Sequence, residues 1–161
     1  APDVAAFEAE LDPATAALVK GRMPLPANPA ASAGSLHAQF LAAVREAEVA
    51  EAADALAKAE RSGVSGAGPT LQAVSENRVH TLIVPDVPYQ EVWRCKASGR
   101  VFATHERAAG ECEGEDLEPV PLADALPRLA ETYGMELRFL SGEPDRRLRE
   151  ELGGLAGLLR W

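Results

Sequence analysis

The spacing of hydrophobic residues along this chain predicts helices that alternate with buried strands. From Ser35 to Ser62 apolar residues recur every three or four positions, which is typical of a helix, and Gly63 ends it. A glycine-rich loop and a short helix follow, up to Asn77. The run Val79–Val84 closes with three consecutive apolar residues before Pro85, as expected for a strand that is covered on both faces.

The last third of the chain repeats this alternation. Apolar residues keep helical spacing from Leu122 to Tyr133, with Asp124 as the expected cap and Pro127 in the first turn. Residues 135–140 alternate between apolar and charged, which indicates a strand. A helix over 144–152 and a final strand over 155–161 complete the pattern.

Together these elements predict an α/β fold, a three-layer sandwich with a mixed central sheet of about four strands. The strands are 79–84, 135–140, 155–161 and one more near the start of the chain. We expect residues 1–34 to be an irregular lead-in with a short helix, and 35–161 to be the folded domain. Within it, 91–95 and 100–104 form a hairpin around a Ser-Gly turn, in an inserted lobe at about 87–120.

Composition narrows the possible functions of these 161 residues. A net charge of −9 argues against a surface dominated by phosphate contacts, and 5% aromatic residues argue against a platform for stacking bases. Two cysteines suggest a reducing cytoplasm, and neither a membrane-length apolar run nor a signal peptide is present. Because the chain begins at Ala1 without methionine, we expect it to be a piece of a longer protein.

Sequence motifs for catalysis or cofactor binding are absent from the chain. It has no glycine-rich phosphate loop with a lysine, no H-E-x-x-H and no G-x-S-x-G. The acidic run from Glu111 to Glu118 is typical of a solvated loop, and the three histidines are scattered. We therefore expect no catalytic residues and no cofactor.

Two stretches carry a resemblance to a known family. Gly66–Ile83 follows the order G-x-x-x-x-L-x-A-[LV]-x-x-[GN]-R-V-x-T-L-[LI], and Leu152–Trp161 matches G-G-[IL]-x-[AG]-[IL]-L-R-[YF] with tryptophan at the end. These motifs are similar to the third domain of class 1 peptide-chain release factors of the archaeal and eukaryotic type, with Pelota and bacterial homologues. The resemblance is patchy before Leu36 and fair from there to the end.

The resemblance implies a partner-docking domain related in fold to ribosomal proteins that bind kinked RNA. Its expected partner is a translational GTPase or another ribosome-associated protein, in translation termination or ribosome rescue. The catalytic G-G-Q loop of the family is missing from this chain, so we expect no enzyme activity here. The expected contact residues are Gly157, Leu158, Leu159, Arg160 and Trp161. The alternative is that Leu158 and Leu159 are core residues of a strand.

Two other functions stay open. The first is contact with ribosomal RNA through the basic residues of the hairpin region, Arg94, Lys96, Arg100 and Arg107, or through the arginines at 146, 147 and 149. The second is a small hydrolase with an unrecognised carboxylate or histidine site. The sequence leaves the oligomeric state open.

The family's inserted lobe often carries zinc knuckles of the C-x-x-C type, and this chain departs from that pattern. Cys95 is followed by Ser98, and Cys112 has no cysteine three residues to either side. The remaining candidate ligands are Cys95, His105, Cys112 and Glu115, a poor set for structural zinc. We expect a metal-free lobe with two free thiols, held together by Val92, Trp93, Val101 and Phe102.

Overall fold

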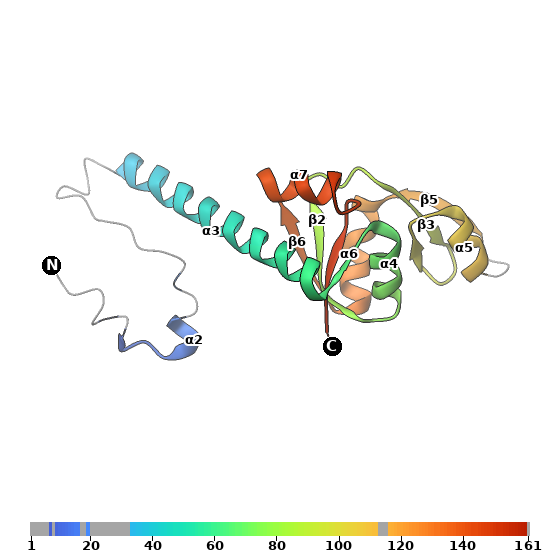
Figure 1. Ribbon diagram of the computed structural model, residues 1–161, viewed down its shortest axis with the longest axis horizontal. Coiled ribbons are helices and arrows are strands. Elements are labelled where there is room, and N and C mark those ends of the chain that lie inside the picture. Colours follow the sequence, from blue (N-terminus) through green and yellow to red (C-terminus); the bar gives the residue numbers. More distant parts are fainter. Residues whose placement is uncertain (1–6, 8, 17–18, 20–32, 113–115, 161) are drawn as a thin grey trace. The chain divides into compact units, whose positions relative to one another are not determined.

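A computed structural model describes residues 7, 9–16, 19, 33–112 and 116–160, in two compact units, 1–50 and 51–161 (Figure 1). The first unit contains α2 (Pro13–Ala16) and the start of α3 (Ala33–Ser62). Asp12 caps α2, because its Oδ1 accepts hydrogen bonds from the backbone N–H groups of Ala14 and Thr15, both at 3.0 Å. The rest of the predicted lead-in lies mostly outside the described residues.

The second unit is built on a four-stranded mixed sheet with the order β1-β7-β2-β6. Its strands are β1 (Val64–Ser65), β2 (Val79–Pro85), β6 (Glu136–Leu140) and β7 (Ala156–Leu159). Strands β2 and β6 run parallel, whereas β7 is antiparallel to both β1 and β2. This confirms the predicted mixed sheet. Its fourth strand was expected near the start of the chain but is β1, which follows α3 within the stretch predicted to be a loop. With two residues, β1 is too short to show a period in the sequence.

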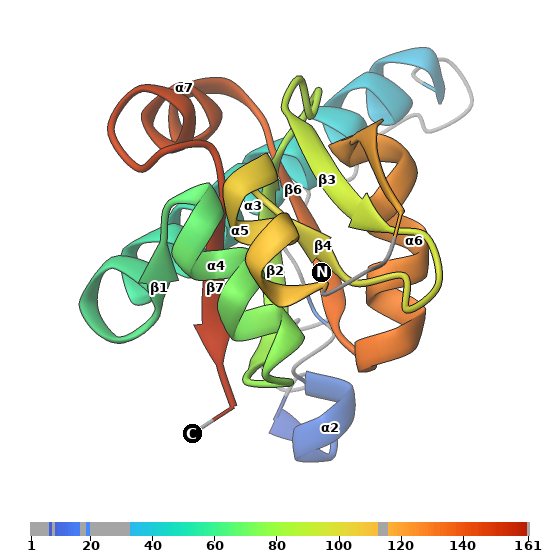
Figure 2. The same ribbon diagram turned by 90° about the vertical axis from the view of Figure 1, so that its right-hand side faces the viewer.

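Helices cover both faces of this sheet, so the predicted three layers are confirmed (Figures 1 and 2). The helices α4 (Ala67–Ser75) and α6 (Leu122–Tyr133) pack on one face against Leu82 and Val84 of β2. The last turns of α3 and α7 (Gly142–Glu150) pack on the other face, against Ile83. Successive side chains of a strand point to opposite faces, which is why β2 reads as one unbroken apolar run.

A second, antiparallel sheet has the order β4-β3-β5. The predicted hairpin is present as β3 (Glu91–Cys95) and β4 (Val101–Phe102). The strand β5 (Leu117–Pro121) and the helix α5 (His105–Glu111) were not predicted, and the two prolines of β5 are tolerated because it is an edge strand. The side chains of the valines at positions 92, 101 and 120 in this sheet are buried in the same hydrophobic core as those of α4 and α6.

The start of α6 differs from the prediction. The helix begins at Leu122, with Pro121 as the preceding residue, so Asp124 lies in its first turn and does not cap it. Pro127 is therefore inside the helix and removes one backbone hydrogen bond. The apolar face of α6 offsets this loss by burying four side chains, those of Leu122, Ala125, Leu126 and Leu129. Gly134 ends the helix in the left-handed conformation.

Candidate functional site

The glycine pair that opens the closing motif forms a tight turn against two other loops. Gly153 and Gly154 have φ values of 70° and 80°, which only glycine adopts without strain. A Cβ on Gly153 would lie 3.1 Å from the Cα atom of Gly66. The side-chain amide of Gln90 donates a hydrogen bond of 3.1 Å to the carbonyl oxygen of Gly153. This turn therefore joins the loop before α4 to the end of the β2–β3 connection.

The next residues of the motif lie inside the sheet as β7. A Cβ on Gly157 would be 3.3 Å from the side chains of Val64 and Val79, so the neighbouring strands pack closely over it. Leu158 is half-buried against the α3–α7 side, and Leu159 against the α4–α6 side. Both leucines thus contribute to the cores, as the alternative interpretation of the motif expected.

Arg160 fastens the end of β7 to the rest of the domain. Its backbone N–H donates to the carbonyl of Arg78 at 2.8 Å, and its Nε donates to the carbonyl of Val79 at 3.1 Å. Its Nη2 donates to the carbonyls of Tyr133 and Gly134 at 2.7 and 2.9 Å. These last two carbonyls lie at the carboxyl end of α6, where a positive charge is favourable. Trp161 lies outside the described residues.

A cleft of about 460 Å³ lies between α4 and the segment formed by β4 and α5. Gln72 and Glu76 line the α4 side. The pKa of the Glu76 carboxyl is lowered below its ordinary value, mainly by a hydrogen bond from Gln72 and secondly by one from Arg78. Arg100 and Glu111 line the opposite side together with other polar side chains. Both signs of charge are present, so the cleft does not select for an anion or a cation.

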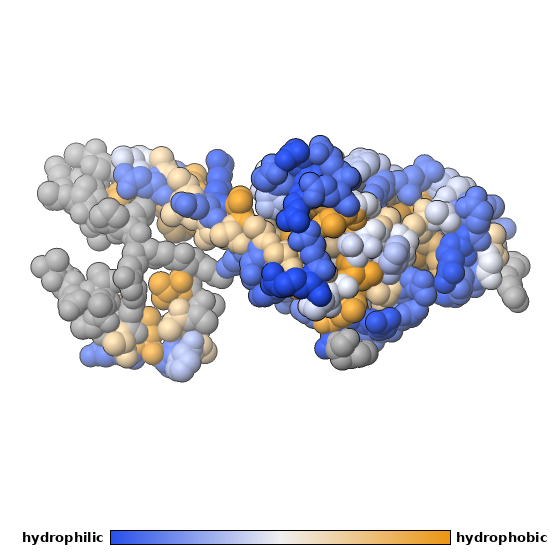
Figure 3. All heavy atoms as spheres, viewed as in Figure 1, coloured by the Kyte–Doolittle hydropathy of each residue, from blue (hydrophilic) through white to orange (hydrophobic). Residues whose placement is uncertain are grey.

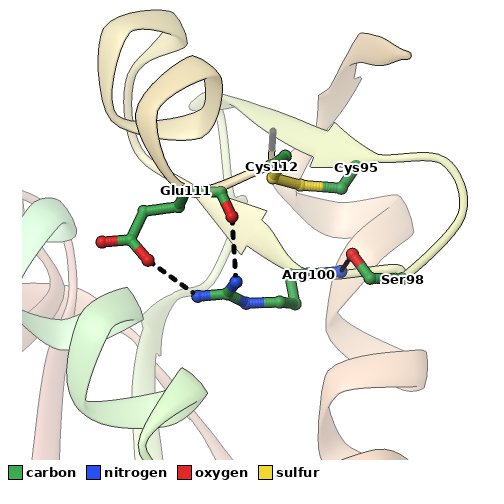
Figure 4. Close-up of a disulfide and its surroundings, with 5 residues drawn as sticks. All are labelled: Cys95, Ser98, Arg100, Glu111 and Cys112. Atoms are coloured by element: carbon green, nitrogen blue, oxygen red, sulfur yellow. Dashed lines mark hydrogen bonds and ion pairs between the residues drawn. A yellow bond between two sulfur atoms is a disulfide. The ribbon is translucent and has the colours of Figure 1, made fainter. Parts of the chain in front are cut away.

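Glu111 holds two arginines of this cleft. Arg100 donates through Nη1 to the backbone carbonyl of Glu111 and through Nη2 to its carboxylate, both at 3.2 Å (Figure 4). Arg107 pairs with the other carboxylate oxygen at 3.4 Å. The Arg100 guanidinium also lies over the ring of Phe102, 5.0 Å from its centroid.

Each basic residue predicted to contact RNA is paired with a carboxylate in the structure. Arg94 pairs with Glu118, and Lys96 lies 3.9 Å from Asp116. The arginines of α7 likewise pair with acidic side chains. The surface of this helix is strongly hydrophilic because it carries both kinds of charge (Figure 3). Pairing neutralises the charge that would otherwise attract phosphates, so the geometry does not favour RNA contact.

The two cysteines are joined in a disulfide, which corrects the expectation of free thiols. The Cα atoms of Cys95 and Cys112 are 6.2 Å apart, and both side chains are buried. The α5 helix, absent from the sequence prediction, brings Cys112 back over the end of β3. His105 lies instead against Trp93, with ring centroids 4.6 Å apart, and Glu115 is outside the described residues. Among the described residues, no three metal-ligating side chains cluster together.

We expect the protein to contain no stoichiometric zinc. Zinc is bound by thiolates, and the sulfurs of a disulfide no longer supply them. Elemental analysis of protein purified without chelator should give far less than one zinc per chain. One zinc per chain, together with two alkylatable thiols after its removal, would contradict this prediction.

Comparisons with known proteins bear on the fold. No protein-family model and no curated protein matches the chain. Among solved structures, it is similar to the C-terminal domain of a peptide chain release factor from Methanosarcina mazei, with a TM-score of 0.56 and 18% identity over 84% of this chain and 98% of that one. The chain has the fold of that release-factor domain.

A second similarity is weaker. It is to Pelota from Archaeoglobus fulgidus, with a TM-score of 0.43 and 24% identity over 74% of this chain. The chain spans about a third of that protein, 32% of its length.

Within the described residues of this chain, no helix is both long and apolar enough to cross a membrane.

Proposed function

We propose that this chain is a docking domain without catalytic activity of its own, acting in the cytoplasm in translation termination or ribosome rescue. The observation that carries the proposal is the fold. It is similar to that of the release-factor C-terminal domain, and the similarity covers 98% of that domain's length. The closing motif supports it from the sequence. The partner is a translational GTPase or another ribosome-associated protein.

The contact runs through the closing stretch 157–161. Gly157, Leu158 and Leu159 place its backbone in the sheet, and Arg160 anchors its end to three backbone carbonyls. Trp161 directly follows this anchored arginine in the sequence. Tryptophan and arginine are the residue types most enriched among the side chains that dominate binding energy.

We expect Trp161→Ala to weaken binding to the translational GTPase of the same organism by at least about fivefold, a loss of roughly 1 kcal/mol. The affinity is measured by titration calorimetry with the GTPase loaded with a non-hydrolysable GTP analogue. The matched control is Tyr89→Ala, which removes another aromatic side chain that is 59% exposed.

The thermal unfolding of both variants separates docking from folding. The proposal expects the Trp161 variant to melt close to the parent chain while it binds more weakly, and the Tyr89 variant to bind normally. Normal binding by the Trp161 variant together with earlier unfolding would assign this residue to the core and refute the contact.

A further inference from the structure

The disulfide closes a loop that includes one side of the cleft. Cys95 is the last residue of β3, and Cys112 directly follows α5, 17 residues later (Figure 4). Between them lie the β3–β4 turn, β4 and the whole of α5. The side of the cleft that faces α4 is therefore contained in a single cross-linked segment.

Apart from the cross-link, α5 is held by the contact of His105 with Trp93, by the hydrogen bonds from Arg100 to Glu111 and by a small core. This seven-residue helix buries only one of its own side chains, that of Ala108. The small core beneath it consists of Cys95, Phe102, Ala108 and Cys112, with Trp93 and Leu117 packed against it. Half of the four buried residues in this core are thus the two joined cysteines. A helix this short is not stable by itself in water, so its position depends on these contacts, of which the disulfide is the one covalent bond.

The cross-link also determines the charge in the cleft. Glu111 precedes Cys112 and pairs with Arg100 and Arg107, whose side chains line the cleft. If the end of α5 separates from β4, Glu111 leaves with it, and Arg100 loses both of its hydrogen bonds to that residue. The β4 side of the cleft would then expose a guanidinium without its carboxylate.

We propose that the Cys95–Cys112 disulfide is a reversible redox latch that holds α5 against β4 and keeps Arg100 paired with Glu111. A dithiol reductant opens it: one thiolate attacks a sulfur of the pair, breaks the S–S bond and forms a mixed disulfide with that cysteine while the other cysteine leaves as a thiolate. The second thiolate of the reductant then attacks the reductant's own sulfur in the mixed disulfide and releases the bound cysteine. Two electrons and two protons pass to Cys95 and Cys112, and the reductant becomes a disulfide. Because both sulfurs are buried, the attack takes place during local opening of α5.

Opening the latch restores chain entropy to the segment. A disulfide restricts the less ordered states of the loop it closes, and a loop of this length is strongly restricted. We therefore expect the amides of α5, residues 105–111, to exchange with solvent at least about tenfold faster after reduction. The amides of α6, which is packed on the central sheet, should keep their exchange rates.

The test is hydrogen–deuterium exchange of the full chain, read by mass spectrometry, with dithiothreitol as the reductant. Thiol alkylation in the same samples gives the redox state, and glutathione disulfide is used to restore the cross-link. The doubly substituted Cys95→Ala, Cys112→Ala chain is the control, whose α5 should exchange rapidly with or without reductant. If that chain does not fold, the oxidised and reduced parent chain supply the comparison alone.

Faster exchange confined to the cross-linked segment, and reversed by reoxidation, supports the latch. Three results would overturn it: a disulfide that dithiothreitol leaves intact under native conditions, full reduction without change in α5, or thiols that do not rejoin in glutathione disulfide. The proposal concerns the cleft and not the closing stretch, so its failure leaves the proposed function unaffected.

Discussion

The substitution Gly63→Ala should lower the free energy of unfolding by about 3 kcal/mol. Gly63 lies between α3 and β1, where the chain passes close to β7. A Cβ at this position would lie 2.8 Å from the Cα atom and 2.9 Å from the carbonyl oxygen of Ala59, and would overlap the carbonyl oxygen of Gly157. All three contacts are backbone atoms, which cannot move aside as a flexible side chain would.

The matched control for this substitution is Gly110→Ala in α5. No heavy atom lies within 4 Å of a Cβ built there, and alanine is the better helix former by about 1 kcal/mol. Urea unfolding of both variants should show a large loss at position 63 and no loss at position 110. Equal stability of the two variants would show that β7 does not approach the end of α3 as closely as described.

The substitution Arg160→Ala should lower the free energy of unfolding by about 2–3 kcal/mol. It removes the side-chain donors to the carbonyls of Val79, Tyr133 and Gly134. Charged donors make the stronger hydrogen bonds, and the carbonyls at the end of α6 lose a favourable positive charge. The loss is measured by chemical unfolding.

Two further variants locate the effect at Arg160. Arg160→Lys should recover only part of the stability, because an ammonium group cannot reproduce the planar fork that reaches three carbonyls. Arg107→Ala removes a more exposed arginine with a single ion pair and should cost less than about 1 kcal/mol. Equal losses at positions 107 and 160 would contradict the anchoring role.

The sequence predicted those parts of the fold whose pattern is local. The unbroken apolar run of β2 arises because this strand is buried on both faces. The helical spacing of apolar residues in α6 arises because this helix is buried on one face only. The turn at Gly134 and the hairpin around residues 96–99 are likewise encoded by their own residues. The resemblance of the two motifs to the release-factor domain led to the correct fold. The sequence identity to the solved domain is only 18%, so the structural similarity is what supports the shared fold.

The features that were missed depend on contacts far apart in the chain. β5 contains two prolines and is recognisable as a strand only beside β3. The cysteine pair forms because the unpredicted α5 brings Cys112 over Cys95, and their spacing of 17 residues carries no such signal. Similarly, the role of Arg160 depends on carbonyls that belong to β2 and to the end of α6.

The location of the partner contact is tested most directly by nuclear magnetic resonance. An isotope-labelled chain is titrated with the translational GTPase of the same organism, and the shifts of the backbone amides are followed. The account predicts that the shifts concentrate at residues 157–161 and at the adjacent start of β2, paired with them in the sheet. Shifts confined to the α4–α5 cleft, or no shifts at saturating GTPase, would contradict the proposed docking role of the closing stretch.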